Sequence, residues 1–321
     1  MAIGRRFIIV GLGASAGALV AGGVFAKLNQ GKSNPTQANN TPDSNPQTPS
    51  TTQPTQIAAN TSGQPLLRFA AVADTGTGDR GQYAVAEAMA ATYKQKAYPL
   101  VILGGDNIYN DGEIEKIKAV FEDPYAPLLN QGVKFHAVLG NHDIRTKNGA
   151  DQLAYAPFHM PTRYYTFRTG ANDAVQFFAI DTNVNAPWQE QLAWLDKSLA
   201  ASDAPWKIVV GHHPIYSSGH YGNTAEFIRD LSPLFKKYNV QLYLCGHDHD
   251  YERSLPIKGT TYIVHGGGAN TRPVGKSATT AYSAAERSFV LLEVYADKIV
   301  TEAIDTKGQV FDRGTIALKS T

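Results

Sequence analysis

The chain has 321 residues, of which 43% are hydrophobic and 10% aromatic, enough for one large catalytic domain with a buried core. Its 29 basic and 28 acidic residues give a formal net charge of +1. This balance provides no long-range field for DNA, RNA or anionic lipid, so no nucleic-acid partner is predicted. An anionic substrate would have to be held by local charge, which bound metal ions can supply.

The N-terminal segment, residues 1–28, has the features of an export signal. Arg5 and Arg6 precede an uncharged stretch rich in Gly and Ala, which ends in small residues. Two arginines, one further residue and two apolar residues also fit the twin-arginine pattern. About 20 such residues can also span a bilayer. We therefore expect an exported protein, periplasmic or extracellular, with a cleaved signal peptide; an uncleaved membrane anchor is the alternative.

Residues 29–65 are composed of Asn, Thr, Gln, Pro and Ser with almost no apolar side chains. Such a segment cannot bury enough surface to offset the entropy lost on ordering. It is therefore predicted to be a disordered linker, and the catalytic domain is predicted to occupy residues 66–321.

The catalytic domain begins with strands that alternate with helices. The apolar run at 67–73 predicts a buried strand, and apolar residues at helical spacing predict a helix over 80–97. Further strands are predicted at 99–103 and 134–139, and helical stretches at 113–121 and 125–130. Beyond them, strands are predicted at 164–167, 175–180, 207–210 and 240–244, and helices at 187–199 and 225–238.

The C-terminal part is mostly strand, with runs at 261–264, 289–294, 299–304 and 314–318. Strands alternating with helices, followed by a strand-rich tail, predict an α/β (α+β) fold. We expect a four-layer α/β/β/α sandwich, in which two mixed sheets are flanked by helices and a dinuclear metal site lies at the carboxyl ends of the strands.

Five short blocks each place a metal-ligand side chain beside a glycine, directly after an apolar run. They are Asp74-Thr75-Gly76, Gly105-Asp106-Asn107-Ile108-Tyr109, Gly140-Asn141-His142-Asp143, Gly211-His212-His213 and Gly246-His247-Asp248-His249. Any one block alone is typical of a turn or a strand corner. Because ligands gather at the carboxyl ends of strands in open α/β sheets, the five together predict one pocket.

The donor types in these blocks suit metal chemistry. Carboxylate, amide and phenolate oxygens and imidazole nitrogens bind Fe, Zn and Mn, and a bridging carboxylate allows two ions to be held. Two metals about 3.5–4 Å apart can clamp the attacking and leaving oxygens of a phosphoryl displacement. The blocks therefore predict a two-metal hydrolase.

The blocks resemble the motifs of the calcineurin-like metallophosphoesterases, and among them the small, animal-type purple acid phosphatases. Tyr109 is the residue that distinguishes the purple enzymes from their relatives. Residues 211–217 and 244–249 are similar to the animal-type members, whereas residues 250–254 look more like the larger plant-type members. The resemblance covers residues 66–318.

The resemblance implies a role for each donor. The first metal, expected to be Fe(III), would be bound by Asp74, Tyr109 and His249. The second, expected to be Fe(II), Zn or Mn, would be bound by Asn141, His212 and His247. Asp106 would bridge the two ions.

The implied reaction is hydrolysis of a phosphate monoester, on a small molecule or a phosphoprotein, by attack of a metal-bound hydroxide. His142 is implied to contact the phosphate or to protonate the leaving oxygen. His220, in the loop after His212, is a second catalytic candidate, against the alternative that it is a solvated loop residue. His213 is expected to point away from the centre.

Two other functions compete with this interpretation. A phosphodiesterase or nucleotide hydrolase could use the same scaffold, but those branches usually lack a tyrosine at the position of Tyr109. A cell-surface binding module with a relic metal site is the third alternative, although a relic has no reason to keep all seven ligands.

Overall fold

The structure is a computed structural model that describes residues 63–318. The predicted signal or anchor segment and nearly all of the predicted linker lie outside these residues. Within the described part, no helix combines the length and apolar character needed to cross a membrane.

The fold contains two mixed sheets. The strands of the first sheet lie in the order β13-β12-β11-β1-β2-β3. Its members are β1 (Leu67–Val72), β2 (Leu100–Leu103), β3 (Lys134–Ala137), β11 (Ser288–Val294), β12 (Lys298–Asp305) and β13 (Val310–Ala317). The strands β1, β2 and β3 are parallel, and the C-terminal strands are antiparallel to their neighbours.

The second sheet has the order β10-β8-β9-β7-β6-β5-β4. Its members are β4 (Tyr165–Thr169), β5 (Val175–Ala179), β6 (Trp206–Val210), β7 (Leu242–Cys245), β8 (Tyr251–Ser254), β9 (Thr261–His265) and β10 (Thr280–Ala284). Its centre is parallel, from β5 through β6 and β7 to β9, and its edges are antiparallel.

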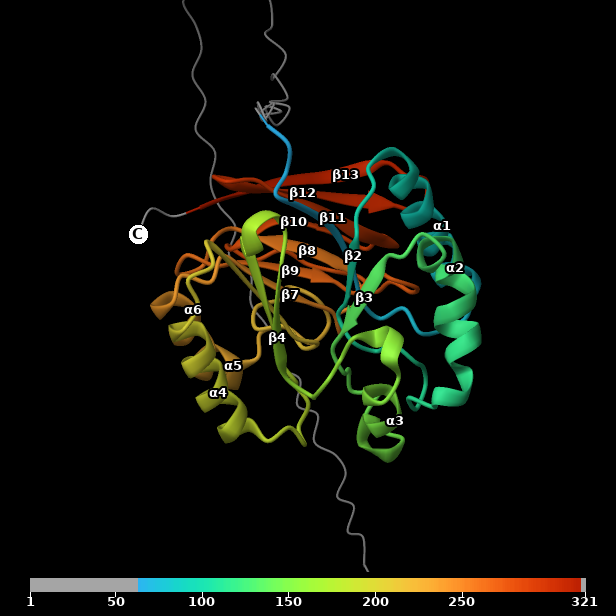
Figure 1. Ribbon diagram of the computed structural model, residues 1–321, viewed down its shortest axis with the longest axis horizontal. Helices are drawn as coiled ribbons and strands as arrows, with labels where there is room; N and C mark the ends of the chain where they lie inside the picture. Colours follow the sequence, from blue (N-terminus) through green and yellow to red (C-terminus); the bar gives the residue numbers. More distant parts are fainter. Residues whose placement is uncertain (1–62, 319–321) are drawn as a thin grey trace, which may run out of the picture. The chain divides into compact units, whose positions relative to one another are not determined.

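Helices cover the outer faces of both sheets, so the predicted four-layer sandwich is confirmed. Figure 1 shows α1 and α2 beside the first sheet and α4, α5 and α6 beside the second. The α-helices are α1 (Arg80–Gln95), α2 (Asp123–Leu129), α3 (Ala150–Leu153), α4 (Trp188–Ala200), α5 (Ala225–Asp230) and α6 (Ser232–Lys237). Shorter turns of helix are η1 (Ile114–Lys116), the π-helical η2 (Lys118–Glu122), η3 (Lys147–Gly149), η4 (Ala156–Phe158) and η5 (Ala171–Asp173).

The alternating side chains of β5 show how the layers are held together. Phe177 points to the other sheet, where its ring lies 5.2 Å from that of Phe69 in an edge-to-face pair. The next residue, Phe178, belongs instead to the cluster that packs α4, α5 and α6 onto the second sheet. Burial of a phenylalanine contributes roughly 1.5–3 kcal/mol, so this one strand stabilises both interfaces.

The structure differs from the prediction at one helix and at two strands, β8 and β10, that were not predicted. The helix predicted over 225–238 is two helices, because Pro233 lies in the first turn of α6 and cannot continue the hydrogen bonding of α5. The strand β8 was not predicted, because its sequence is largely charged and polar. Its half-buried Arg253 pairs with Asp312 of β13, with nitrogen–oxygen distances of 2.7 and 2.9 Å.

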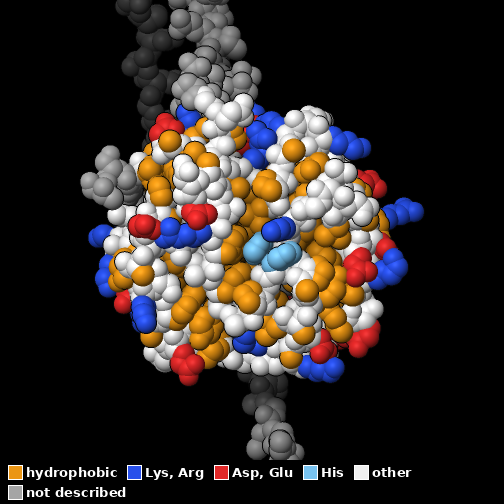
Figure 2. Space-filling view, viewed as in Figure 1, with side chains coloured by type: hydrophobic (Ala, Val, Ile, Leu, Met, Phe, Trp, Pro, Cys, Tyr) orange, Lys and Arg blue, Asp and Glu red, His pale blue; other side chains and the backbone are white. Residues whose placement is uncertain are grey.

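The edge strands β3 and β4 lie near each other and border a cavity of about 380 Å³. Figure 2 shows histidine side chains at the centre of this face, among hydrophobic neighbours. The cavity is lined by His136 and His159, whose rings stack 5.0 Å apart, and His136 also stacks on Phe167 at 3.9 Å. The lining of this cavity contains none of the predicted metal ligands.

Candidate metal centre

The predicted ligands converge from the carboxyl ends of five strands. Those from the first sheet follow β1, β2 and β3, and those from the second follow β6 and β7. The structure brings all seven together through direct contacts: Asp74, Asp106, Tyr109, Asn141, His212, His247 and His249.

Tyr109, Asp74 and His249 form one half of the centre. The Tyr109 hydroxyl lies 3.1 Å from Asp74 Oδ1 and 3.1 Å from His249 Nε2. His249 Nε2 is also 3.4 Å from Asp74 Oδ1. Three donors from three separate loops therefore surround one position.

His212 joins the second half of the centre to Asp106. Its Nε2 lies 3.1 Å from Asn141 Oδ1 and 3.5 Å from Asp106 Oδ1. Its Nδ1 lies 2.9 Å from the carbonyl oxygen of Gly104. Because a carbonyl can only accept, Nδ1 carries the proton and the Nε2 lone pair faces the centre, as in a metal-ligating imidazole.

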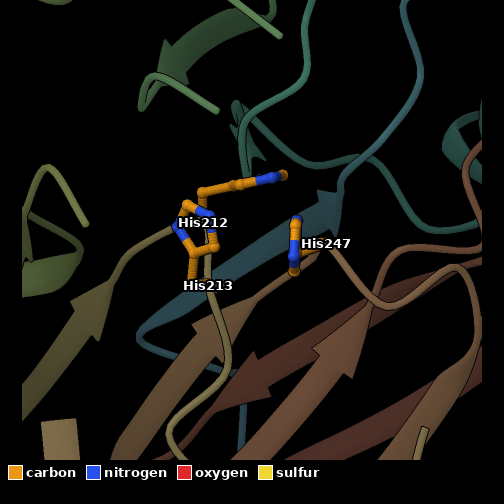
Figure 3. A group of neighbouring side chains, drawn as sticks. All are labelled: His212, His213 and His247. Carbon is orange, nitrogen blue, oxygen red and sulfur yellow. The ribbon is translucent and has the colours of Figure 1, made fainter. Parts of the chain in front are cut away.

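A third histidine lies close to this half. Figure 3 shows the rings of His212, His213 and His247 converging from the ends of β6 and β7. The rings of His213 and His247 are 4.4 Å apart, and one ring nitrogen of each of the three residues lies within 4.8 Å of the others. The expectation that His213 points away from the centre is therefore wrong. Its Nδ1 is within 2.9 Å of Thr182 Oγ1.

The charge of the centre fits metal ions. Asp74 and Asp106 are each 1% exposed, and together with His212 they offer ligand atoms within 4.8 Å of one another. Within residues 63–318, no Lys or Arg forms an ion pair with either carboxylate. Two buried carboxylates without a cationic partner are costly, and bound cations would remove that cost.

The titration of the donors follows from the same arrangement. Burial and the carboxylates of Asp74 and Asp106 raise the pKa of Tyr109 well above its usual range. Burial lowers the pKa of His247, and the neighbouring histidines lower it further. Burial also opposes protonation of His212, but the carboxylates outweigh it and raise that pKa. A neutral imidazole at His247 is the form that binds metal.

The backbone is strained where it presents the ligands. Asp74, Asp106 and His247 adopt positive φ angles of 57°, 51° and 69°, a region that side chains other than glycine rarely occupy. Such outliers cluster at functional sites. The neighbouring glycines are needed for close approach, because a Cβ on Gly246 would lie 2.2 Å from Asp74 Oδ2, and one on Gly140 would lie 2.1 Å from Asp106 Oδ1.

Asp143 was not predicted to have a role, although it lies in the third block. Its buried carboxylate accepts hydrogen bonds from the backbone N–H groups of Asn107, Ile108 and Gly140, at 2.8–3.1 Å. The side-chain amides of Asn107 and Gln152 also donate to it. Asp143 therefore ties the loop that holds Asp106 and Tyr109 to the loop that holds Asn141. Only the folded contacts reveal this role.

The two predicted catalytic histidines are placed differently. His142 Nδ1 lies 2.6 Å from the carbonyl oxygen of Asn110, so this nitrogen carries the proton, and Nε2 lies 3.9 Å from Asp106 Oδ2. His220 is exposed, and its ring lies 4.8 Å from that of Tyr221. Tyr221 in turn stacks on His247 at 4.1 Å. His142 thus borders the centre, whereas His220 reaches it through Tyr221.

A two-sheet sandwich with Asp, Asn, Tyr and His donors at its strand ends defines a class, the dinuclear-type phosphoesterases. Residues 67–251, more than half of the chain, match the Calcineurin-like phosphoesterase family, and the chain belongs to this family. The predicted family and the predicted class of enzyme, a phosphoester hydrolase, are confirmed.

The relatives are acid phosphatases. The chain is 30% identical to tartrate-resistant acid phosphatase type 5 of Sus scrofa over 250 residues, which are 67% of this chain and 73% of that protein. It is 32% identical to purple acid phosphatase 17 of Arabidopsis thaliana over 213 residues, 57% of this chain and 62% of the relative.

Solved structures share the fold. GAP50, described as the anchor in the inner membrane complex of Plasmodium, has a TM-score of 0.70 and 25% identity, with 79% of this chain and 90% of that chain covered. The purple acid phosphatase PPD1 of yellow lupin has a TM-score of 0.67 and 21% identity, with 78% and 53% covered. The lupin likeness supports the fold alone.

Proposed function

We propose that this protein is an exported, purple-type phosphatase that hydrolyses phosphate monoesters to an alcohol and inorganic phosphate. The observation that carries the proposal is the position of Tyr109. Its hydroxyl contacts both Asp74 and His249 at 3.1 Å, so the phenolic oxygen lies at one half of the centre, where it would bind a cation as the phenolate. Relatives named purple or tartrate-resistant acid phosphatases support the same reaction.

The chain's donors divide between two ions. Asp74, Tyr109 and His249 would hold one, expected to be Fe(III). Asn141, His212 and His247 would hold the other, Fe(II), Zn or Mn, with Asp106 shared between them. When bound, the two ions would activate a water molecule and neutralise charge on the phosphoryl oxygens.

His142 is the residue proposed to assist the departure of the alcohol. The P–O bond to the alcohol breaks as water's oxygen bonds to phosphorus, and the alkoxide needs a proton. Nδ1 of His142 is committed to the Asn110 carbonyl, and Nε2 accepts from Arg145 Nη2 at 3.3 Å, so Nε2 is the atom that would deliver the proton when both ring nitrogens carry one. The exposed His220 is retained as a second candidate, acting at the outer side of Tyr221.

The proposal is tested by measuring the visible absorption of the iron-loaded protein and its hydrolysis of model phosphate esters. Iron-loaded protein should absorb visible light through charge transfer from the Tyr109 phenolate, and Tyr109→Phe should abolish the band while both irons remain bound. The wild type should also hydrolyse p-nitrophenyl phosphate faster than bis-p-nitrophenyl phosphate. A colourless protein holding two irons contradicts the purple type, and a preference for the diester supports the phosphodiesterase alternative.

A second candidate, a surface binding module, is favoured by the likeness to GAP50, which is described as an anchor. Metal content separates the two functions. A module with a relic site would bind fewer than two ions and would turn over neither substrate. The intact donor set at the centre supports the enzyme instead.

The proposed export depends on residues 1–28. Expression of the full chain in a bacterial host, with and without the change Arg5→Lys and Arg6→Lys, tests the twin-arginine route. Loss of the protein from the periplasmic fraction in the variant alone would support that route. The mass of the exported chain distinguishes a cleaved signal from a retained anchor.

A further inference from the structure

A cavity of about 440 Å³ opens beside the centre, and its lining includes two cationic side chains and no acidic one. Tyr109, His142 and His249 border it on the side of the proposed metals. Lys116 and Arg272 also line it. A volume of this size suits a small-molecule ligand.

The cavity is the place where the leaving group must lie. His142 is proposed to give a proton to the leaving oxygen, and proton transfer requires hydrogen-bond reach. Because His142 lines this cavity, the organic part of the substrate extends into it. Residues across the cavity therefore face the leaving group.

Arg272 is the cation of this lining that has no acidic partner among residues 63–318. Its guanidinium donates to the Tyr221 hydroxyl at 3.2 Å, and no carboxylate lies within ion-pair distance of it. Lys116, by contrast, is neutralised by Glu113 at 2.9 Å. An unpaired guanidinium in a cavity retains its capacity to bind an anion.

Contacts to the metal ligands hold Arg272 in place. Its backbone N–H donates to the carbonyl oxygen of His249 at 2.7 Å. Its guanidinium lies 5.5 Å from the centre of the Tyr221 ring, which stacks on His247. The half-exposed Tyr221 thus links Arg272 to one proposed ligand, and the backbone links it to another. A guanidinium group that is held in position binds a carboxylate or phosphate more strongly than a mobile one.

We propose that Arg272 is a specificity-determining residue, which selects phosphate monoesters whose leaving group carries a second anionic group, a carboxylate or another phosphate. The inference rests on the proposed function, since it assigns the substrate class of the same centre. The second anion would pair with Arg272 while the scissile phosphate occupies the metal centre.

The test compares substrates that differ only in the second anion. The metal-loaded wild type is assayed on 3-phosphoglycerate against glycerol 3-phosphate, and on fructose 1,6-bisphosphate against fructose 6-phosphate. The first pair probes a carboxylate and the second a phosphate. We expect kcat/KM to be about tenfold higher for the doubly anionic member of at least one pair, as one charge-assisted hydrogen-bonded contact allows.

The variant Arg272→Gln should abolish this preference, mainly through a higher KM, and should leave kcat/KM for glycerol 3-phosphate within about threefold of wild type. Arg272→Lys keeps the charge and should retain part of the preference. Lys118→Gln is the control, because Lys118 is exposed, pairs with Asp123 and does not line the cavity. Two metal ions per chain in every variant would establish that the centre is intact.

Three results would overturn the inference. One result is that the wild type has equal kcat/KM for both members of both pairs. Another is that Arg272→Gln lowers kcat/KM equally for both members of a pair. Either would show that Arg272 does not select the second anion. A preference that survives unchanged in Arg272→Gln would do the same. These results leave the proposed function standing, as does failure to hydrolyse any of the four substrates by a metal-loaded wild type that still hydrolyses p-nitrophenyl phosphate, which would overturn the inference alone. Failure on p-nitrophenyl phosphate as well would overturn both.

Discussion

The two sheets contribute different chemistry to the same centre. The loops that follow β1, β2 and β3 supply oxygen donors, from Asp74, Asp106, Tyr109 and Asn141. The loops that follow β6 and β7 supply only imidazole, from His212, His247 and His249. Neither sheet alone offers a mixed oxygen and nitrogen set of the kind that suits iron, zinc or manganese.

This division means that the centre exists only when the sheets pack face to face. The contacts across the boundary are direct: His212 meets Asn141 at 3.1 Å, and the backbone N–H of His247 donates to Asp74 at 2.9 Å. Metal binding and packing of the sandwich should therefore stabilise each other, as in other sites that form only on folding. Substitutions on the oxygen side and on the imidazole side test how far the two contributions are equivalent.

The largest effect is expected on the oxygen side, at Asp106. If Asp106 is shared by both ions, Asp106→Ala should remove both and reduce kcat/KM by more than about a thousandfold. The matched change on the imidazole side, His247→Ala, should remove one ion and leave the other. Metal analysis and p-nitrophenyl phosphate hydrolysis measure both effects. Retention of one tightly bound ion by Asp106→Ala would refute the bridging role.

A smaller effect is expected from the carboxylates that support each side. Asp143 and Asp248 each follow a histidine of a ligand block and are fully buried. Asp143 ties two ligand loops together, whereas Asp248 accepts from Ser217 Oγ at 2.5 Å and from the N–H of Tyr221 at 3.0 Å, in a segment, residues 217–221, that contains no predicted ligand. Asp143→Asn should weaken metal binding by about 10–100-fold, because an amide cannot accept all five hydrogen bonds.

Asp248→Asn serves as the matched control for that change. It should leave the metal affinity within about threefold and alter KM instead, because it loosens Tyr221 at the mouth of the centre. Calorimetric titration of metal into the metal-free proteins measures the first effect, and steady-state kinetics the second. Equal losses of metal affinity in the two variants would show that Asp143 and Asp248 contribute equally to metal binding on the oxygen and imidazole sides.

The sequence predicted the central parallel strands well because most of their residues are buried. All four residues of β2 and all five of β5 are buried, and these runs are apolar apart from Gln176. β8 was missed for the opposite reason. Its Arg253 and Glu252 find partners in distant segments, at Asp312 and at Ser218, which no local pattern contains.

The candidate centre could be assembled from sequence because the ligands lie in short blocks that follow strands, and each block contains a glycine. What could not be predicted depends on contacts between loops. The role of Asp143 requires the packing of three backbone N–H groups around one carboxylate. The position of Arg272 likewise depends on Tyr221, 51 residues away along the chain.

The smallest effect is expected where the sheets meet without ligands, at the cavity between β3 and β4. Burial, with His159 and Lys134, lowers the pKa of His136 from 6.5 to about 4. The folded protein therefore keeps this ring neutral where the unfolded chain takes up a proton. The contribution of His136 to stability is complete above about pH 6.5 and is lost as the pH falls toward 4.

His136→Phe should remove that loss, because phenylalanine cannot be protonated and the Nδ1 atom it replaces has no hydrogen-bond partner. Between pH 6.5 and 4, the metal-free wild type should lose about 2–3 kcal/mol more stability than the variant, as measured by urea unfolding. At pH 7 the metal-loaded wild type and the His136→Phe variant should each bind two ions and have the same kcat. Parallel stability curves would show that His136 takes up its proton over the same pH range in the folded and unfolded states. A change in metal content would show that residues at this cavity also influence the metal centre.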